Sequence, residues 1–356
     1  MAYVIGICVS LVRNNLIAVK SISRKNFLKP VRCFSATHSK NMKLLQFTYK
    51  DRPEEVRAGV LHPNGDEVID INKADPSISV TLIEILKSGE LDKVKQLQFF
   101  QPCTCTLPTV PLTQVNLKAP IHNVDKVLCI GLNYADHCTE QNLTPPTVPM
   151  VFSKFNSCII GPSDAIKIRT DVTAVSIGLN YADHCTEQNL TPPTVPMKVD
   201  WEVELVVVMG KKASFVKAAE AYDYVLGYTV AQDVSARDWQ KEKNMGQFLL
   251  GKAMDTFCPV GPWIVTKDEI KNPQNLDISC SINGELKQTS NTKQLIHKIP
   301  DLIESVMTLL PGDMILSGTP GGVGMYRSPP QYLKPGDVIR SEVQKIGAFE
   351  IKCDKF

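Results

Sequence analysis

The chain has 356 residues, of which 43% are hydrophobic and 21% charged, and its formal net charge is +2. These values are typical of a globular protein, and they exclude collagen-like, low-complexity and fully disordered chains. The near-neutral charge offers no broad cationic surface, so we expect no nucleic-acid partner.

The first 50 residues contain nine Lys or Arg residues and no Asp or Glu. Basic, acid-free segments with serines and recurring apolar residues are typical of mitochondrial transit peptides. We therefore expect residues 1–34 to be a leader that is cleaved before Ser35 on import into the mitochondrial matrix. A secretory signal fits less well because Arg13-Asn14-Asn15 interrupts the apolar run. No run reaches the ~20 apolar residues that span a membrane, so no membrane partner is expected either.

Residues 42–118 predict a small N-terminal β/α region in which turn residues such as Pro63-Asn64-Gly65 separate short strands. Its expected elements are strands at 44–49, 57–61 and 67–71 and helices at 81–87 and 91–97. A stretch punctuated by prolines then leads into a larger domain at residues 119–356.

Strands dominate the larger domain. They are expected at residues 127–130, 151–155, 203–208, 224–230, 276–282, 314–317 and 338–343. The clearest helix is expected at 301–309 and should end at Pro311-Gly312. Because the strands do not alternate regularly with helices, a doubly wound sheet is disfavoured, and a strand-rich α+β roll or barrel is expected instead.

One internal repeat stands out, because residues 130–150 and 177–197 have the same sequence, IGLNYADHCTEQNLTPPTVPM. The first copy follows the strand-like run 127–130 and leads into the run 151–155. The second copy has no comparable strand before it and joins abruptly to Lys198. We therefore expect the first copy to belong to the fold and residues 176–198 to be an inserted surface loop. Such insertions are tolerated because the loop-closure cost rises only ~0.6 kcal/mol per doubling of length.

The strongest acidic pattern is Glu202-Val203-Glu204 at the start of an apolar run. Residues i and i+2 of a strand share a face, so the two carboxylates project side by side. They repel each other unless a cation neutralises them, and hard oxygen ligands suit Mg²⁺, Mn²⁺ or Ca²⁺. Asp233 follows another apolar run and is a candidate third ligand. A solvated strand edge is the alternative interpretation.

His137 and Glu140 lie three residues apart, so they meet if the segment is helical. A carboxylate that orients an imidazole in this way raises its basicity and suits a general base. An ordinary surface pair is the alternative.

Two further features could bind an anion. Lys252 follows Gly251 and could face either a substrate anion or solvent. The glycine-rich turn at residues 317–324 offers backbone N–H groups that can bind a carboxylate. It lacks the Lys-Ser/Thr ending of a phosphate-binding loop, so nucleotide binding is not indicated.

Taken in order along residues 42–356, these features resemble the fumarylacetoacetate hydrolase superfamily, in particular its branch of fumarylacetoacetate hydrolase domain-containing proteins. The motifs that carry the resemblance are Gly131-Leu132-Asn133-Tyr134-Ala135-Asp136-His137, Glu202-Val203-Glu204, Asp233-Val234-Ser235-Ala236-Arg237-Asp238, Gly251-Lys252 and Ser317-Gly318-Thr319-Pro320. The resemblance implies a mixed β-sandwich roll that usually forms a homodimer.

The resemblance also implies roles for individual residues. Glu202, Glu204 and Asp233 would hold one divalent cation, most simply Mg²⁺, with Mn²⁺ or Ca²⁺ as alternatives. Lys252 would contact a bound oxyanion, Thr319 a substrate carboxylate, and His137 with Glu140 would handle protons or activate water. Arg237 and Gln240 occupy positions that often approach the substrate.

The implied substrate is a small 2-oxo dicarboxylic acid or a related β-dicarbonyl acid, and three reactions branch from its enolate. Tautomerisation needs the fewest catalytic groups, so conversion of enol-oxaloacetate to the keto form is the favoured function. Cleavage of a C–C bond in acylpyruvates and decarboxylation of oxaloacetate are alternatives. An inactive scaffold, blocked by the insertion, is a further one.

Overall fold

The computed structural model describes residues 42–97, 107–169 and 197–356. The expected transit peptide and the second copy of the repeat, apart from Met197, lie outside these residues. Within the described ranges, no helix is both long and apolar enough to cross a membrane.

The small N-terminal region forms as expected, with strands and helices at the predicted places. Its elements are β1 Lys43–Tyr49, β2 Arg52–Leu61, β3 Glu67–Asp70, α1 Ile71–Ala74, α2 Leu82–Lys87, α3 Leu91–Leu97, β4 Thr109–Pro111, η2 Leu112–Gln114 and β5 Val115–Lys118. Two ends differ from the prediction: β2 begins at Arg52 instead of residue 57, and Ile71 begins α1 instead of closing β3. The Asp70 carboxylate accepts a hydrogen bond from the Lys73 N–H at 3.1 Å and so caps that helix.

The largest sheet has the strand order β4-β3-β2-β1-β14-β12-β11-β17-β6-β7, with β5 beside β1 and β8 beside β14. Its remaining strands are β6 Val127–Gly131, β7 Met150–Lys154, β8 Ile159–Ile160, β11 Val203–Met209, β12 Val225–Gln232, β14 Cys258–Thr266 and β17 Met314–Leu316. Most neighbours are antiparallel, whereas β17 with β6 and β14 with β8 are parallel, so the sheet is mixed.

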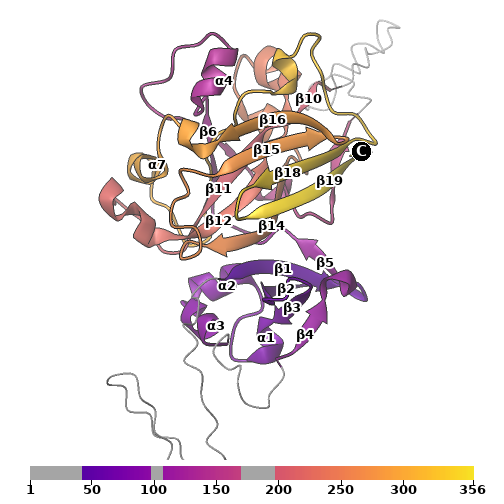
Figure 1. The fold of residues 1–356 in the computed structure, drawn as a ribbon, viewed down its shortest axis with the longest axis vertical. Coiled ribbons are helices and arrows are strands. Elements are labelled where there is room, and N and C mark those ends of the chain that lie inside the picture. The colour runs from indigo at the N-terminus through magenta and orange to yellow at the C-terminus, as the bar shows by residue number, and fades with distance from the viewer. Residues whose placement is uncertain (1–41, 98–106, 170–196) are drawn as a thin grey trace, which may run out of the picture. The chain divides into compact units, whose positions relative to one another are not determined.

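A second sheet of five strands has the order β16-β15-β18-β19-β9, and β15, β16, β18 and β19 are seen side by side in Figure 1. Its strands are β9 Ala165–Ile168, β15 Asp277–Ile282, β16 Glu285–Asn291, β18 Val338–Val343 and β19 Gly347–Lys355; the short strands β10 Val199–Asp200 and β13 Ser235–Ala236 pair separately. Helices and turns between the strands are α4 Ala135–Glu140, η3 Asn156–Cys158, η4 Ala218–Tyr224, η5 Asp238–Lys243, α6 Leu249–Lys252, η6 Thr292–Gln294, α7 Ile299–Ser305 and η7 Gly324–Tyr326.

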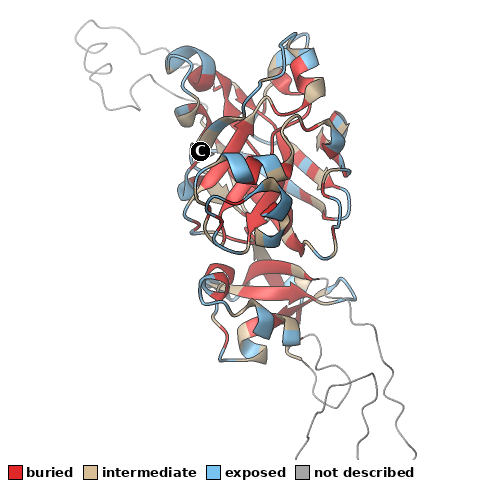
Figure 2. Ribbon diagram, turned by 90° about the vertical axis from the view of Figure 1, so that its left-hand side faces the viewer, coloured by how far each residue is buried: buried red, intermediate tan, exposed pale blue. Residues whose placement is uncertain are grey.

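The two sheets share one apolar core, and β11 is buried along its whole length. Val203, Leu205 and Val207 face the core that contains residues of the second sheet, whereas Val206 and Val208 pack on the opposite side. Figure 2 shows the same pattern, with buried strands and exposed residues gathered on loops and helices. The expected strand-rich α+β sandwich roll is confirmed.

The helix expected at residues 301–309 is shorter and begins earlier than predicted. It spans Ile299–Ser305, with proline in its first turn, and the backbone is extended at Val306. Leu309 instead exchanges backbone hydrogen bonds with Ala213 at 2.8 and 2.9 Å. This long-range pairing outweighs the local helical pattern that predicted the longer helix.

The first copy of the repeat connects β6 to β7, and these two strands pair antiparallel. Of the expected insertion, residues 176–198, the structure describes only the last two residues. Met197 is buried, and the Lys198 carbonyl accepts a hydrogen bond from the Arg237 N–H at 2.9 Å. These two residues are therefore packed into the fold.

Asp70 forms a buried ion pair within the N-terminal region. Its carboxylate accepts hydrogen bonds from Arg57 Nε at 2.7 Å, from Arg57 Nη2 at 2.9 Å and from the Tyr49 hydroxyl at 2.8 Å. Burial alone would raise the pKa of Asp70, but the bonds from Arg57 and Tyr49 outweigh it and hold that pKa below its usual value.

We expect Asp70→Asn to lower the free energy of unfolding by about 2 kcal/mol near neutral pH, because it leaves the partly buried Arg57 without its charged partner. Asn preserves the helix cap, so the change isolates the ion pair. A carboxyl whose folded pKa is depressed stabilises the fold above its unfolded pKa of ~3.9, and this contribution is lost as the pH falls through the folded pKa. The difference between wild type and variant in urea unfolding should shrink below about pH 4. A difference that stays constant into the acid range contradicts this role for the pair.

Candidate active site

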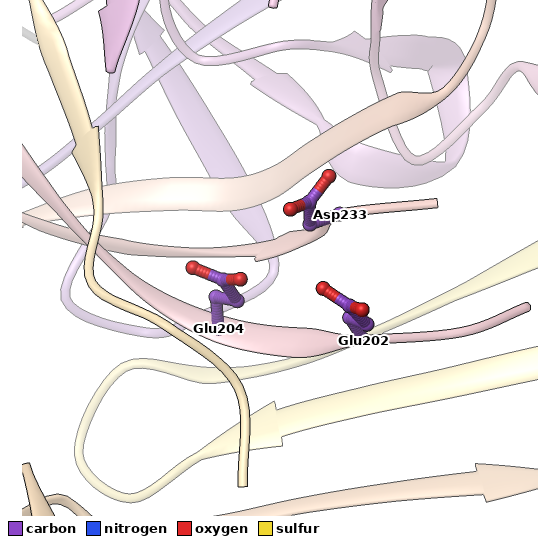
Figure 3. A group of neighbouring side chains, drawn as sticks. All are labelled: Glu202, Glu204 and Asp233. Atoms are coloured by element: carbon purple, nitrogen blue, oxygen red, sulfur yellow. The ribbon is translucent and has the colours of Figure 1, made fainter. Parts of the chain in front are cut away.

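Three carboxylates converge where β11 begins and β12 ends. Glu202 and Glu204 lie on one face of the chain entering β11, because they are two residues apart in extended backbone. The Asp233 N–H donates to the Glu202 carbonyl at 2.8 Å, which continues the antiparallel register of the two strands and places Asp233 opposite Glu202. One oxygen of each side chain lies within 4.8 Å of the others. Figure 3 shows the three carboxylates around a common gap.

The chemistry of this group fits a divalent cation. All three side chains are buried, with residue exposures of 6% for Glu202, 1% for Glu204 and 0% for Asp233. Three carboxylates in a dry site are strongly unfavourable without positive charge, and an all-oxygen donor set suits Mg²⁺, Mn²⁺ or Ca²⁺. The residues present could therefore hold such an ion.

Two cations of the chain already bind Glu202. Lys252 Nζ lies 2.7 Å from Glu202 Oε2 and 2.8 Å from Asp233 Oδ2, and Arg237 Nη2 lies 2.7 Å from Glu202 Oε1. Burial alone would raise the pKa of Glu202, but the charges of Lys252 and Arg237 outweigh it and lower that pKa to about 2. Glu202 is therefore a carboxylate at physiological pH.

Glu204 has a different environment. Its Oε2 accepts a hydrogen bond from the Gly318 N–H at 2.7 Å. Burial, followed by the negative charges of Asp233 and Glu202, raises the pKa of Glu204 well above its ordinary value. Of the three acids, Glu204 is thus the one with the greatest need of an added cation.

His137 and Glu140 form the predicted pair on α4. His137 Nδ1 lies 2.8 Å from Glu140 Oε2, and Glu140 Oε1 accepts a hydrogen bond from the Gly322 N–H at 2.8 Å. The other imidazole nitrogen, Nε2, lies 2.8 Å from the Gln141 side-chain nitrogen. In this network Gln141 donates to Nε2, so the ring proton belongs on Nδ1 and is directed at Glu140.

A pocket of about 90 Å³ opens above these groups. Seven of the nine predicted site residues line it: His137, Glu202, Glu204, Arg237, Gln240, Lys252 and Thr319. The other two, Glu140 and Asp233, lie behind it and contact His137 and Lys252. The structure therefore brings all nine residues together, while their individual roles stay predictions.

The three expected substrate-binding residues are held by the protein itself. Arg237 donates from Nη1 to the Gln240 Oε1 at 2.9 Å and from Nε to Asp200 at 2.9 Å. Gln240 lies in a π-helical turn, η5, a geometry that is frequent at functional sites. The Thr319 hydroxyl donates to the Val203 carbonyl at 3.0 Å.

The glycine-rich turn does bind carboxylates through its backbone, but those carboxylates belong to the protein. Its N–H groups donate to Glu204, Glu140 and Asp200, the last from Gly324 at 2.7 Å. The turn thereby fixes acids on β11, α4 and β10 relative to one another. The expectation that it meets a substrate carboxylate stays a prediction.

Sequence reasoning missed four residues that shape the site. Asp200 holds Arg237, and Gln141 contacts His137 while accepting a hydrogen bond from the Tyr326 hydroxyl at 2.8 Å. Lys154 lies 2.8 Å from Asp233 Oδ1 and is fully buried. Of the four, only Lys154 could have been noticed in the sequence, because a lysine inside a strand-like apolar run is unusual.

Comparison with known proteins agrees with this geometry. The model of the fumarylacetoacetate (FAA) hydrolase C-terminal family matches residues 126–353. Oxaloacetate tautomerase Fahd2a, mitochondrial, from Rattus norvegicus is 45% identical over 86% of this chain and 90% of its own length. Oxaloacetate tautomerase fahd2, mitochondrial, from Xenopus laevis is 42% identical over 93% and 96%.

Among solved structures, maleylpyruvate hydrolase from Sphingobium sp. SYK-6, in complex with manganese(II) and pyruvate, is 28% identical with a TM-score of 0.64. The similarity covers 88% of this chain and 99% of that one. The matched segment contains every predicted site residue and more than half of the chain. The chain therefore belongs to the fumarylacetoacetate hydrolase family.

Proposed function

We propose that this chain is a metal-dependent oxaloacetate tautomerase that converts enol-oxaloacetate to the keto form in the mitochondrial matrix. The observation that carries the proposal is the convergence of Glu202, Glu204 and Asp233 beneath a pocket that His137 and Lys252 also line. The relatives named above, whose names give both the activity and the compartment, support it.

Tautomerisation removes the proton from the enol oxygen and adds one to the neighbouring carbon. A divalent ion held by the three carboxylates would supply a Lewis acid that polarises the 2-oxo oxygen. The unprotonated Nε2 of His137 is placed to take the proton of the enol oxygen and to return it to the neighbouring carbon, and the Lys252 ammonium is placed to donate a hydrogen bond to the enolate oxygen that forms in between. Glu140 fixes the imidazole and its tautomer, and Gln141 must turn aside when the substrate enters.

The substrate is a small 2-oxo dicarboxylic acid, which carries two negative charges. Arg237 and Thr319 line the pocket, and Gln240 orients the Arg237 guanidinium, which offers donors for the carboxylates of the substrate. The Thr319 hydroxyl must leave the Val203 carbonyl before it can donate to a carboxylate. The pocket volume of about 90 Å³ suits a compact acid better than a long acyl chain.

Cleavage of a C–C bond in acylpyruvate-type acids is the second candidate. One observation favours it: His137 and Glu140 are hydrogen-bonded at 2.8 Å, an arrangement that can activate water, which hydrolysis needs and tautomerisation does not. Decarboxylation needs neither water nor this pair, and no observation favours it.

Mg²⁺ is the ion we propose for the cell, because three hard carboxylates on rigid backbone suit it, with Mn²⁺ or Ca²⁺ able to replace it. We also propose that residues 1–34 are removed on import, that residues 42–118 and 119–356 are the N-terminal region and the catalytic domain, and that the mature protein is a homodimer.

Purified residues 35–356 with Mg²⁺ should accelerate the decay of the ultraviolet absorbance of enol-oxaloacetate, while an acylpyruvate assayed in parallel is cleaved more slowly. Lys252→Met should lower kcat/KM for the enol by at least about 100-fold, because it removes the cation that stabilises the enolate oxygen. Faster acylpyruvate cleavage than enol decay would instead make the chain a hydrolase. No turnover of either acid would support the inactive scaffold.

Glu204→Gln should weaken Mn²⁺ binding, measured by electron paramagnetic resonance, by more than about 100-fold. The loss of a ligand should exceed the ~10–100-fold effect of outer-shell partners. Metal-dependent turnover should disappear with it. Glu285→Gln is the matched control, because Glu285 is exposed and pairs with Lys287 outside the pocket. Unchanged Mn²⁺ affinity in Glu204→Gln excludes Glu204 as a ligand.

Deletion of residues 176–196 should preserve or raise activity and thermal stability, because the first copy of the repeat supplies the site. The deletion stops before Met197, whose side chain is buried. In the full chain, His137→Ala should lower turnover by about 100-fold or more, whereas His184→Ala, the same change in the same sequence, should not. The opposite result would make the second copy the working one.

A further inference from the structure

Lys154 is a buried cation that the proposed reaction does not use. It is the last residue of β7, and its side chain is 0% exposed. It is absent from the residues that line the pocket, although Phe152 on the same strand lines it. Lys154 therefore does not touch the substrate, and its charge needs another explanation.

The Lys154 ammonium has four acceptors around it. Nζ lies 2.8 Å from Asp233 Oδ1 and donates to the carbonyls of Phe257 at 2.7 Å, Val234 at 3.2 Å and Lys252. An ammonium can donate three hydrogen bonds, so its whole capacity is used inside the protein. Burying a lysine is unfavourable unless such partners are present, and an apolar side chain of similar volume would avoid this cost.

These contacts divide the two oxygens of Asp233 between different partners. Lys154 Nζ forms an ion pair with Oδ1, and Lys252 Nζ lies 2.8 Å from Oδ2. Lys154 thus holds the Oδ1 side of the carboxylate, which keeps the Asp233 side chain beside Glu202 and Glu204 (Figure 3). An outer-shell donor that orients a ligand in this way commonly sets the affinity of a metal site.

The same ammonium also fixes the backbone that carries Lys252. The Lys154 ammonium donates to the main-chain carbonyls of Lys252 and Phe257, which lie before and after the turn that follows α6. The main chain of Lys252 is therefore linked to Asp233 through Lys154. Lys154 belongs to β7, which pairs with β6, so it also links Asp233 and Lys252 to the two strands that flank the His137 segment.

We propose that Lys154 is a positioning residue that orients the Asp233 carboxylate for the divalent cation and fixes the main chain of Lys252. This inference rests on the metal site of the proposed function, but it is tested by ion binding alone. It predicts that the affinity for the ion depends on Lys154 even though Lys154 cannot reach the ion.

The experiment compares Mn²⁺ affinity, measured by electron paramagnetic resonance, in wild type, Lys154→Met and Lys126→Met. Lys126 is the matched control, because its Nζ lies 2.7 Å from the buried carboxylate of Asp313 and it does not line the pocket. Both variants remove the cation that pairs with a buried carboxylate and should lose thermal stability. Lys154→Met should weaken Mn²⁺ binding about 10- to 100-fold, and Lys126→Met should leave it within about two-fold of wild type.

Unchanged Mn²⁺ affinity in Lys154→Met overturns the inference, as does an equal loss in both variants, since that would reflect general loosening. If Lys154→Met does not fold, Lys154→Gln takes its place with the same two outcomes. A wild-type protein that does not bind Mn²⁺ overturns the metal site itself, and this inference with it. Wild-type binding without tautomerase activity contradicts only the proposed reaction.

Discussion

The repulsion among three carboxylates on two neighbouring buried strands is the constraint around which this site is built. Glu202, Glu204 and Asp233 cannot all be charged in a dry interior without compensation. Lys252 and Arg237 compensate Glu202, Lys154 compensates Asp233, and Gly318 offers Glu204 a single backbone N–H. Compensation is therefore weakest at Glu204, whose pKa is raised by burial and by the neighbouring carboxylates of Asp233 and Glu202.

The neutralising groups come from distant parts of the chain, so the sheet must form before the charges can be balanced. Lys154 ends β7, Arg237 follows β13 and Lys252 ends α6. The strands β6, β17, β11 and β12 are consecutive in the large sheet. This order brings the segments that carry Lys154, Arg237 and Lys252 to one side of the core. The apolar cores on both faces of β11 thus stabilise an arrangement that electrostatics alone would oppose.

Local periodicity was sufficient to predict part of the site. The i, i+2 spacing of Glu202 and Glu204 and the i, i+3 spacing of His137 and Glu140 each place two side chains together within one element. Asp233 was identified by its place after an apolar run, but its position opposite Glu202 depends on the register of two strands. Lys154 was missed because its partners lie on other segments, and no spacing along β7 reveals them.

The fold shows the same division between local and long-range information. The strands predicted from apolar runs all form close to their expected places, although β14, β16 and β19 were not predicted, and the helix predicted at 301–309 was wrong at both ends. Its end depends on the pairing of Leu309 with Ala213, nearly a hundred residues away, and this contact leaves no trace in the helical pattern. Elements that are set by their own periodicity are predictable, and boundaries that are set by a tertiary partner are not.

The two copies of the repeated segment illustrate the same division, because their sequences are identical and only their surroundings differ. Both copies contain the same His-x-x-Glu spacing, so no property of the segment itself can decide which copy works. The flanks decide, because the first copy lies between β6 and β7, which pair with each other beside β17. The second copy lies between β9, which pairs with β19, and β10, which pairs with β13. The strands around the first copy hold α4 beside the carboxylates, so the place of His137 in the site is set by its neighbours in the sheet.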